Sequence, residues 1–531
     1  MPRSADTLIV GASVRTLDPA RPTASAVAVA GGLIAGLDDD AVALRGPGTE
    51  VIDLAGATLT PGLVDGHTHP LLGVEQFSGL DLSGCRDVAD LRARLASAAR
   101  QAGRGDWVRG FGLDHNVFAG QPITSAAIDD VLAGVPAFLR LYDGHSALAG
   151  GAALALAGID RPREFPQRAH IVCDEAGRPT GHLVEHAAMD LIYEVMPEVS
   201  LADRRERALE LLAAMAATGL TGGHVMDGPD AALELLASIE TGQDLPLRLR
   251  LAPWSMPGTD PGDLIGLQRR RGRRWRVGAV KFFIDGTVEG GTAWLDQPDC
   301  HGQSSDSFWL DPADYTSTVR RLAAAGVQTC THAIGDAGVG HVIDTLADAS
   351  AGGVRHRVEH LETMPDDLVK RLAASGLVAS MQPSHTAYTK ADHSDEWSRR
   401  LGPERADRAW RCRDVRDAGV VLALGSDWPV ADYDARLVLG YARDRTLPGS
   451  DVPPVTPEQA LTGLQSLEGM TSHAALAANE ENVAGRVAPG YRADLTAFSL
   501  DPVTAPADEV ADAPIRLTMV DGAITHRAAT G

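Results

Sequence analysis

The stretch TPGLVDGHTHP, residues 60–70, decides the fold and the chemistry expected of this chain. Its apolar beginning predicts a buried strand that ends in a loop carrying His67 and His69. Residues i and i+2 of a strand point to the same side, so both imidazoles can bind one metal ion. Taken alone, the pair leaves open an alternative in which one histidine lies in the core and the other on the surface.

Length and charge define the broad class of protein. The chain has 531 residues, of which 44% are hydrophobic, and such a chain can bury a large core. A formal net charge of -23 repels nucleic acid and acidic membrane surfaces. The local exception is RRRGRRWR, residues 269–276, which we interpret as a solvated helix end and loop. We therefore expect a small-molecule substrate, with no nucleic acid or membrane partner.

Cysteine use and the amino terminus predict the compartment. The five cysteines are odd in number and widely spaced, without a CxxC pair, and suit a reduced cytosol. The first residues lack the apolar core of a secretory signal, and no segment is long enough to span a bilayer. We expect a soluble cytoplasmic protein.

The order of strand and helix patterns predicts an α/β fold in three parts. Residues 1–60 alternate short β-like runs with turns, which predicts a small antiparallel sheet, and residues 480–531 behave in the same way. These two ends are expected to pair into a composite β-sandwich. Alternating strands and helices in 61–70 and 201–479 predict a (β/α)8 TIM-type barrel. Residues 71–200 are then an insertion after the first strand that caps the site.

The barrel prediction depends on a count of strand patterns. After the strand of His67, seven more are found at 220–226, 247–253, 277–285, 327–335, 354–360, 377–383 and 420–428. Helical patterns lie between many of them, as at 201–219, 312–326 and 404–419. Active sites of such barrels gather at the carboxyl ends of the strands. Six polar residues lie there: His67, His69, Lys281, His332, His360 and Asp427.

Lys281 is unusual in this set, because a metal ion repels an ammonium group. Burial lowers the pKa of a lysine and leaves a reactive amine. Carboxylation by CO₂ would convert Lys281 into an anionic carbamate that can bridge two ions. The alternative is a lysine paired with Asp285 or Glu289.

Five motifs together carry a family resemblance. HTH after PGLVDG, VKFFIDGT, THAIGD, RVEH and GSDWPV resemble the amidohydrolase superfamily, in its YtcJ-like branch, which includes N-substituted formamide deformylases. The resemblance covers nearly the whole chain. It implies a (β/α)8 barrel, a composite β-sandwich and a binuclear zinc-type centre.

Carried over by position, the resemblance assigns His67, His69 and Asp427 to one metal ion, and His332 and His360 to the other. It places a carboxylated Lys281 between the two ions. Zinc is expected from the nitrogen-rich ligands, although Mn, Fe, Co or Ni could occupy them. A homodimer is left open, since dimers are common among such barrels and no residue demonstrates one.

The expected mechanism is attack of a metal-bridging hydroxide on an sp² carbon. Asp427 would accept the proton of the water and return it to the leaving nitrogen, and His145 in the GHSA turn would help to hold the oxyanion. Weaker candidates for substrate contact are His385, Trp428, Asp114, Glu185 and His224, the last also a spare ligand or a donor to a ligand.

One departure from the branch concerns substrate choice. Members of the branch often carry an arginine after the DG motif, whereas this chain has DGTVEGGTAWL with Gly290 and Gly291. An arginine that could bind a substrate carboxylate is missing there. A neutral or bulkier substrate is therefore favoured over an acidic amino-acid derivative.

The function predicted is hydrolysis of an amide-type, non-peptide C–N bond, with an N-substituted formamide as one specific candidate. Ester or lactone hydrolysis and deamination use the same kind of barrel and stay open. Lys281 argues against deamination, which usually uses one metal ion. A barrel that only binds ligands is the non-enzymatic alternative, and it is disfavoured because all six ligand positions are filled.

Overall fold

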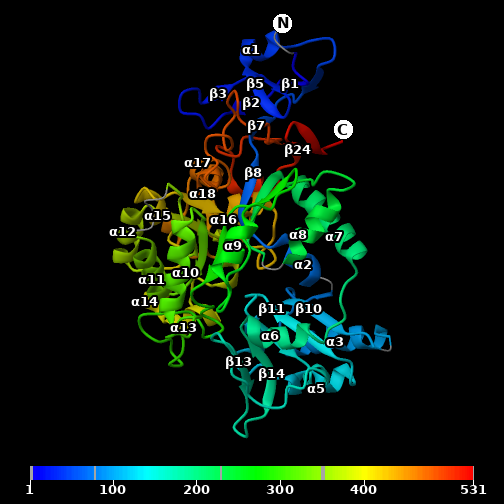
Figure 1. The fold of residues 1–531 in the computed structure, drawn as a ribbon, viewed down its shortest axis with the longest axis vertical. Helices are drawn as coiled ribbons and strands as arrows, with labels where there is room; N and C mark the ends of the chain where they lie inside the picture. The colour runs from blue at the N-terminus through cyan, green and yellow to red at the C-terminus, as the bar shows by residue number, and fades with distance from the viewer. Residues whose placement is uncertain (1–3, 77–78, 104, 228–229, 348–352, 530–531) are drawn as a thin grey trace.

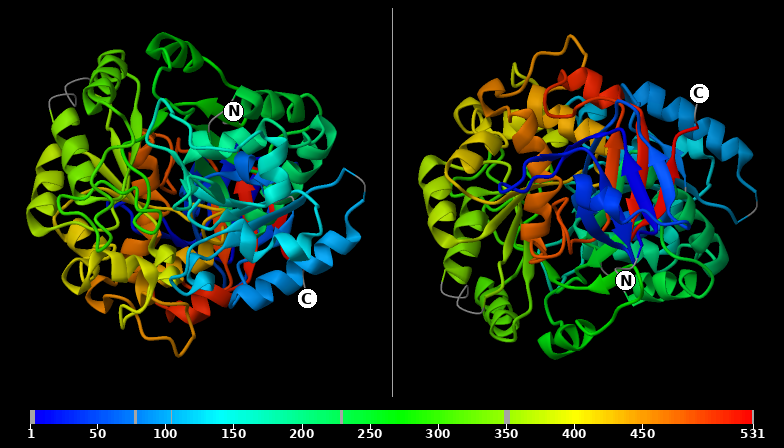
Figure 2. Two further views of the ribbon diagram at one scale, coloured as in Figure 1. Left: turned by 90° about the horizontal axis from the view of Figure 1, so that it is seen from below. Right: turned by 90° about the horizontal axis from the view of Figure 1, so that it is seen from above.

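The computed structural model describes residues 4–76, 79–103, 105–227, 230–347 and 353–529. The protein has mixed α/β content, with central strands surrounded by helices (Figures 1 and 2). In these ranges, no helix is both long enough and apolar enough to cross a bilayer. All five cysteines are unpaired.

Two parallel sheets form the centre of the molecule, with strand orders β17-β16-β15-β8 and β18-β19-β20-β21-β22. The strands of the first are β8 (Leu63–Thr68), β15 (Leu220–Val225), β16 (Arg248–Leu251) and β17 (Trp275–Val277). Those of the second are β18 (Val280–Phe283), β19 (Thr329–Ala333), β20 (Arg357–His360), β21 (Val378–Met381) and β22 (Leu422–Leu424). The strand predicted over 277–285 begins in β17, breaks at 278–279 and continues in β18, so its two parts pair with different neighbours.

The two parallel sheets meet at both edges. On one side, Trp254 and Lys281 form a parallel bridge, and the Lys281 amide donates to the Pro253 carbonyl over 2.9 Å. On the other, the Asp427 amide donates to the His67 carbonyl over 2.7 Å, just beyond β22. The described ladders stop short of one continuous sheet, so closure into a (β/α)8 barrel stays a prediction.

Two glycines explain how β8 comes so close to the end of β22. A Cβ atom at Gly66 would lie 2.6 Å from the Leu424 carbonyl oxygen, and one at Gly425 would lie 2.5 Å from the His67 amide nitrogen. Neither position has room for a side chain. The backbones can therefore pack directly together, and this places Asp427 beside the two histidines of β8.

The two ends of the chain share one sheet, because β7 pairs with β23 in antiparallel register. Its order is β25-β24-β23-β7-β2-β3, and a second sheet has the order β5-β4-β1-β6. The strands of the first are β2 (Ser13–Arg15), β3 (Thr23–Ala24), β7 (Thr58–Pro61), β23 (Leu495–Phe498), β24 (Ile515–Val520) and β25 (Ala523–Arg527). Those of the second are β1 (Thr7–Val10), β4 (Val27–Ala30), β5 (Leu33–Leu37) and β6 (Glu50–Asp53).

The purely antiparallel arrangement predicted for the first sixty residues is wrong. β1 pairs with β6, and β2 with β7, in parallel. The reason is the route of the chain, since the β4–β5 hairpin and α1 (Asp38–Ala43) separate each strand from its parallel neighbour. Apolar residues from both sheets, including Ile52 and Leu517, share one core.

The part of the chain that follows β8 and precedes β15 forms a six-stranded mixed sheet. This sheet lies at the opposite end of the molecule from the terminal sheets (Figure 1). Its order is β13-β14-β12-β11-β10-β9, with β9 (Leu80–Asp81), β10 (Val108–Leu113), β11 (Ala137–Leu141), β12 (Ser146–Ala149), β13 (His170–Cys173) and β14 (Pro179–Val184). Its helices are α3 (Val88–Gln101), α4 (Asp129–Leu132), α5 (Gly151–Leu156) and α6 (His186–Tyr193).

Helices connect the parallel strands and cover them from outside. They include α2 (Pro70–Gln76), α7 (Leu201–Ala217), α8 (Asp230–Ile239), α9 (Pro261–Leu267), α10 (Pro312–Ala324), α11 (Asp336–Leu346) and α12 (Asp366–Ser375). Later ones are α13 (Glu396–Leu401), α14 (Pro403–Ala406), α15 (Cys412–Asp417), α16 (Ala435–Asp444), α17 (Gly463–Gly469), α18 (Ser472–Ala477) and α19 (Ala507–Asp512).

The single helix predicted over 404–419 is wrong, because α14 and α15 are separate. Between them, Trp410 is buried in a positive-φ conformation, and its ring stacks on Trp397 at 5.0 Å. Its amide donates to the Glu362 carbonyl over 2.9 Å. Burial of this large ring competes successfully with the local helical pattern.

The contact at Gly66 gives a test of the fold. We expect Gly66→Ala to lower the free energy of unfolding by about 1–3 kcal/mol, because the new methyl group overlaps the Leu424 carbonyl. Gly48→Ala is the matched control, since a Cβ there meets nothing within 4 Å, and it should change stability by less than about 1 kcal/mol. Urea unfolding measures both, and equal effects would contradict the packing argument.

Candidate metal centre

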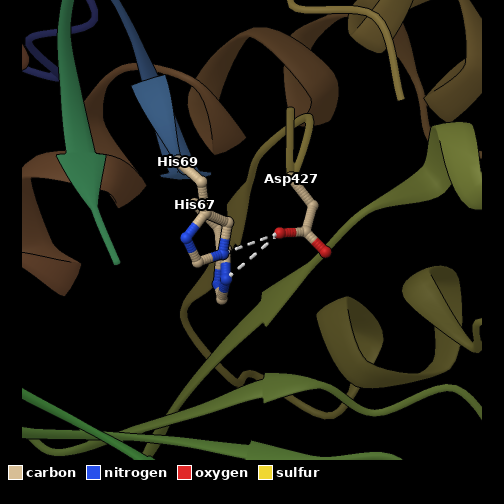
Figure 3. A group of neighbouring side chains, drawn as sticks. All are labelled: His67, His69 and Asp427. Carbon is tan, nitrogen blue, oxygen red and sulfur yellow. Dashed lines mark ion pairs between the residues drawn. The ribbon is translucent and has the colours of Figure 1, made fainter. Parts of the chain in front are cut away.

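His67, His69 and Asp427 form a buried cluster where β8 ends beside the segment after β22 (Figure 3). Asp427 Oδ1 lies 3.4 Å from His67 Nε2 and 3.2 Å from His69 Nε2. The backbone holds this geometry, because the Asp427 amide donates to the His67 carbonyl and the His69 amide to the Trp428 carbonyl, each over 2.7 Å. Two imidazole nitrogens and a carboxylate oxygen directed at one point are a suitable donor set for a divalent transition metal.

Each of the four predicted histidine ligands has one ring nitrogen held by another group. The contacts are His67 Nδ1 with Glu359 at 2.7 Å, His69 Nδ1 with Asp227 at 2.9 Å, His360 Nδ1 with Gln382 at 2.9 Å and His332 Nε2 with the Gly286 carbonyl at 3.1 Å. Such contacts fix the ring orientation and leave the second nitrogen for a metal ion. This pattern fits a metal site better than it fits isolated core histidines.

Burial keeps most of these imidazoles neutral. It lowers the pKa of His67 to about 4 and the pKa of His332 and His360 well below the usual value. Burial also opposes protonation of His69, but the carboxylates of Asp227 and Asp427 outweigh it and raise its pKa. A neutral imidazole keeps the lone pair that binds a metal ion.

Lys281 lies in the same buried cluster, with Nζ 3.3 Å from His67 Nε2. Burial lowers the pKa of this lysine to about 8, which increases the fraction of free amine near neutral pH. Asp285, the alternative partner, instead accepts hydrogen bonds from the backbone of Ile334, Gly335 and Trp294.

The predicted ligands of a second ion lie close together. The ring centroids of His332 and His360 are 4.4 Å apart, and those of His67 and His360 are 4.7 Å apart. Among the described residues, however, the second group with metal-binding spacing around Asp427 consists of His360, His385 and Asp427. His385 Nε2 lies 3.7 Å from Asp427 Oδ2 and is buried without a hydrogen-bond partner. His385, predicted for substrate contact, therefore faces the cluster around Asp427.

A further group comes from the insertion, which packs over the same cavity. His145 Nδ1 contacts Glu185 at 2.9 Å, and the His145 ring lies 4.9 Å from that of His332. His145, Glu185 and His186 have metal-binding spacing as well. Glu185 accepts a hydrogen bond from Thr292 over 2.7 Å, so it holds His145 against the strands.

A cavity of about 90 Å³ lies between the strand ends and the insertion. The predicted residues in its wall are His69, His145, Lys281, His332, His360, His385 and Asp427. The wall also contains Arg140, Tyr142, Asp143, His186, Glu289 and Glu362, which sequence reasoning missed as site residues. Glu289 and Glu362 each lie two residues after a quoted motif, VKFFIDGT and RVEH, and could have been found there. Arg140 and Asp143 are on the insertion, where no strand-end rule applies.

Several residues proposed for substrate contact are outside this wall. Trp428 packs beneath α2, where a Cβ at Gly73 would lie 2.0 Å from its ring, and Asp114 caps a short 3-10 helix by accepting from the Asn116 amide. Glu185 contacts His145, which is in the wall, and is not itself part of it. His224 Nδ1 contacts Arg357 at 2.7 Å, and Arg357 in turn binds Glu359. His224 is therefore connected to His67 through Arg357 and Glu359.

Comparisons with known proteins identify relatives over nearly the whole chain. The model of the amidohydrolase family matches residues 50–526. YtcJ of Bacillus subtilis (strain 168), named as a candidate amidohydrolase, is 28% identical over 90% of this chain and 91% of its own. The N-substituted formamide deformylase of Arthrobacter pascens is 27% identical over 99% of both chains. The protein LONG AFTER FAR-RED 3 of Arabidopsis thaliana is 28% identical over 93% of this chain and 87% of its own.

Among solved structures, an uncharacterized metal-dependent hydrolase from Pyrococcus horikoshii OT3 has a similar fold. It superposes with a TM-score of 0.72 at 22% identity and covers 94% of this chain and 99% of its own. At that level of identity the likeness concerns the fold.

The contact between Asp227 and His69 gives a test of the centre. We expect Asp227→Asn to weaken binding of a divalent ion by about 10–100-fold, because the carboxylate that orients His69 is lost. Asp129→Asn is the matched control, since Asp129 lies in the insertion and accepts from the Gly151 amide. Metal content after dialysis against buffered zinc measures the effect, and equal retention by both variants would argue against a metal role for His69.

Proposed function

Because the chain belongs to the amidohydrolase family, we propose that it is a metal-dependent hydrolase that cleaves an amide-type, non-peptide C–N bond of a small molecule. The observation that carries the proposal is the cluster of His67, His69 and Asp427, in which the Nε2 atom of each histidine lies within 3.4 Å of Asp427 Oδ1. The proposal includes closure of the two parallel sheets into a (β/α)8 barrel and of the terminal sheets into a composite β-sandwich.

The residues present fit a metal centre. His67, His69 and Asp427 would hold one ion, and His332, His360 and a carboxylated Lys281 would complete a second position, with zinc as the expected metal. When bound, such ions lower the pKa of a water molecule and polarise the carbonyl group of the substrate. The remaining steps, proton transfer and stabilisation of the carbonyl oxygen, are assigned to side chains of this protein.

Asp427 is the proposed acid and base. Burial raises its pKa, but His67 and His69 outweigh that effect and keep the pKa below the usual range, so the carboxylate is ionised at neutral pH. Its Oδ2 faces the cavity beside His385. From there Asp427 can take a proton from water and deliver it to the leaving nitrogen.

His145 is the proposed donor to the carbonyl oxygen that gains negative charge. Glu185 holds its Nδ1, and the ring lies in the cavity wall beside His332. A donor that is already oriented before reaction costs little reorganisation in the transition state.

The two cavities near the centre support a substrate with a compact acyl group and a bulky nitrogen substituent. The cavity at the strand ends, about 90 Å³, borders one of about 660 Å³ through Leu72, Arg140, His186 and Trp254. Met189, Met196 and Met256 give the larger cavity apolar, adaptable walls. Glu362 in the smaller cavity disfavours a substrate carboxylate there, whereas burial and the neighbouring Glu362 raise the pKa of Glu289 well above its usual value. A formamide with an apolar nitrogen substituent matches these shapes, and one relative bears the name of such an activity.

The substrate proposal is tested with N-alkyl and N-aryl formamides, the matching acetamides and the matching formate esters. We expect hydrolysis of formamides to exceed that of acetamides, because the acyl side of the cavity is small. Chelator treatment should abolish turnover, and added zinc should restore it. Turnover that survives complete metal removal would overturn the mechanism.

The role of Asp427 is tested by Asp427→Asn, which we expect to lower kcat by about 10²–10⁴-fold because the proton acceptor is lost. Asp432→Asn, in the following loop, is the control and should keep full activity. Both are assayed at matched metal content. Equal kcat values at equal metal content would exclude Asp427 as the acid and base.

Carboxylation of Lys281 is tested with isotope-labelled bicarbonate and carbon NMR. We expect one carbamate signal in the wild-type protein and none in Lys281→Met, whereas the exposed Lys370→Met keeps the signal. A wild-type protein with bound metal and no carbamate signal would exclude the bridging role.

A further inference from the structure

The arginine-rich stretch 269–276 has no part in the proposed hydrolysis, yet it borders a third cavity, of about 210 Å³. The wall includes Val64, Arg248 and Trp275, which lie in the amino-terminal parts of β8, β16 and β17, whereas the metal centre is at the carboxyl ends. The prediction of a solvated helix end and loop is therefore incomplete. Arg274 and Trp275 are buried, and Arg276 belongs to a strand.

Arg250 is the central charge of this cavity. Arg250 is 7% exposed and donates to the Gly278 carbonyl, while its Nε has no hydrogen-bond partner in the part of the chain that the structure describes. Among the described residues, no carboxylate lies within ion-pair distance of it. A buried cation without a counter-ion is costly, and burial here lowers the pKa of Arg250 to about 10.

The carboxylates that line the cavity are already engaged by other arginines. Glu480 accepts hydrogen bonds from both Arg276 and Arg492, the latter over 2.7 Å. Asp494 accepts from Arg248 over 3.0 Å. The cavity wall thus carries more positive than negative charge, and Arg250 is the buried arginine in it that has no carboxylate within ion-pair distance among the described residues.

We propose that this cavity binds a small oxyanion, with Arg250 as its principal donor. A guanidinium group presents several N–H donors in one plane and matches the oxygens of phosphate, sulfate or a carboxylate. The volume far exceeds the about 15 Å³ that one water needs, so a polyatomic ion has room. The site is independent of the proposed hydrolase activity, because its residues and those of the metal centre are different.

The test is calorimetric titration of the purified full-length protein with phosphate, sulfate and acetate, at constant ionic strength set with sodium chloride. We expect saturable binding of at least one oxyanion to the wild-type protein, weakened at least tenfold in Arg250→Met. Arg443→Met is the matched control, because Arg443 lies away from the cavity and donates to the carbonyls of Pro502 and Ala505. It should keep the wild-type affinity.

Asp427→Asn separates this cavity from the metal centre, which could also attract an oxyanion. Binding that survives Arg250→Met and disappears in Asp427→Asn would overturn the proposal, as would the absence of saturable binding to the wild-type protein. Ala484→Glu adds a second variant in case Arg250→Met does not fold. Ala484 lines the cavity, so the new carboxylate should abolish oxyanion binding and raise the melting temperature in phosphate-free buffer.

Discussion

The close contact between β8 and the segment after β22 is the constraint on which the rest of the site depends. Gly66 and Gly425 leave no side chain between the two backbones, so the Asp427 amide can donate to the His67 carbonyl. That bond joins two segments 360 residues apart in the chain and brings the Asp427 carboxylate within 3.4 Å of both histidines. Asp427 has positive φ, and such strained conformations persist where the surrounding structure enforces them.

Burial and charge compensation act together around this contact. The imidazoles become neutral donors because they are removed from water, while carboxylates held deeper in the protein orient them. Glu359 illustrates the balance, since it binds His67 on one side and the Arg357 guanidinium on the other. A buried carboxylate is tolerated there because a buried cation pairs with it.

The two ends of the parallel strands differ in chemistry. At the carboxyl ends, histidines and carboxylates line a small cavity closed by the insertion. At the amino-terminal ends, arginines dominate, and Arg250 lacks the carboxylate that Arg357 has. His224 shows how near the two regions are, because it borders the cavity of Arg250 and also contacts Arg357. Arg357 in turn binds the same carboxylate as His67, that of Glu359. The strands thus separate a site suited to metal ions from a site suited to anions.

The sequence by itself determined the order of the parallel strands and the polar residues at their carboxyl ends, because strand periodicity and strand-end position are local patterns. Tertiary structure decided the rest. Trp410 ended a predicted helix because its ring is buried against Trp397, and β1 pairs in parallel with β6 because the chain makes a hairpin between them. Arg140 and Arg250 had no local signal at all. Their importance comes from which distant groups surround them in the folded chain, and only packing determines that.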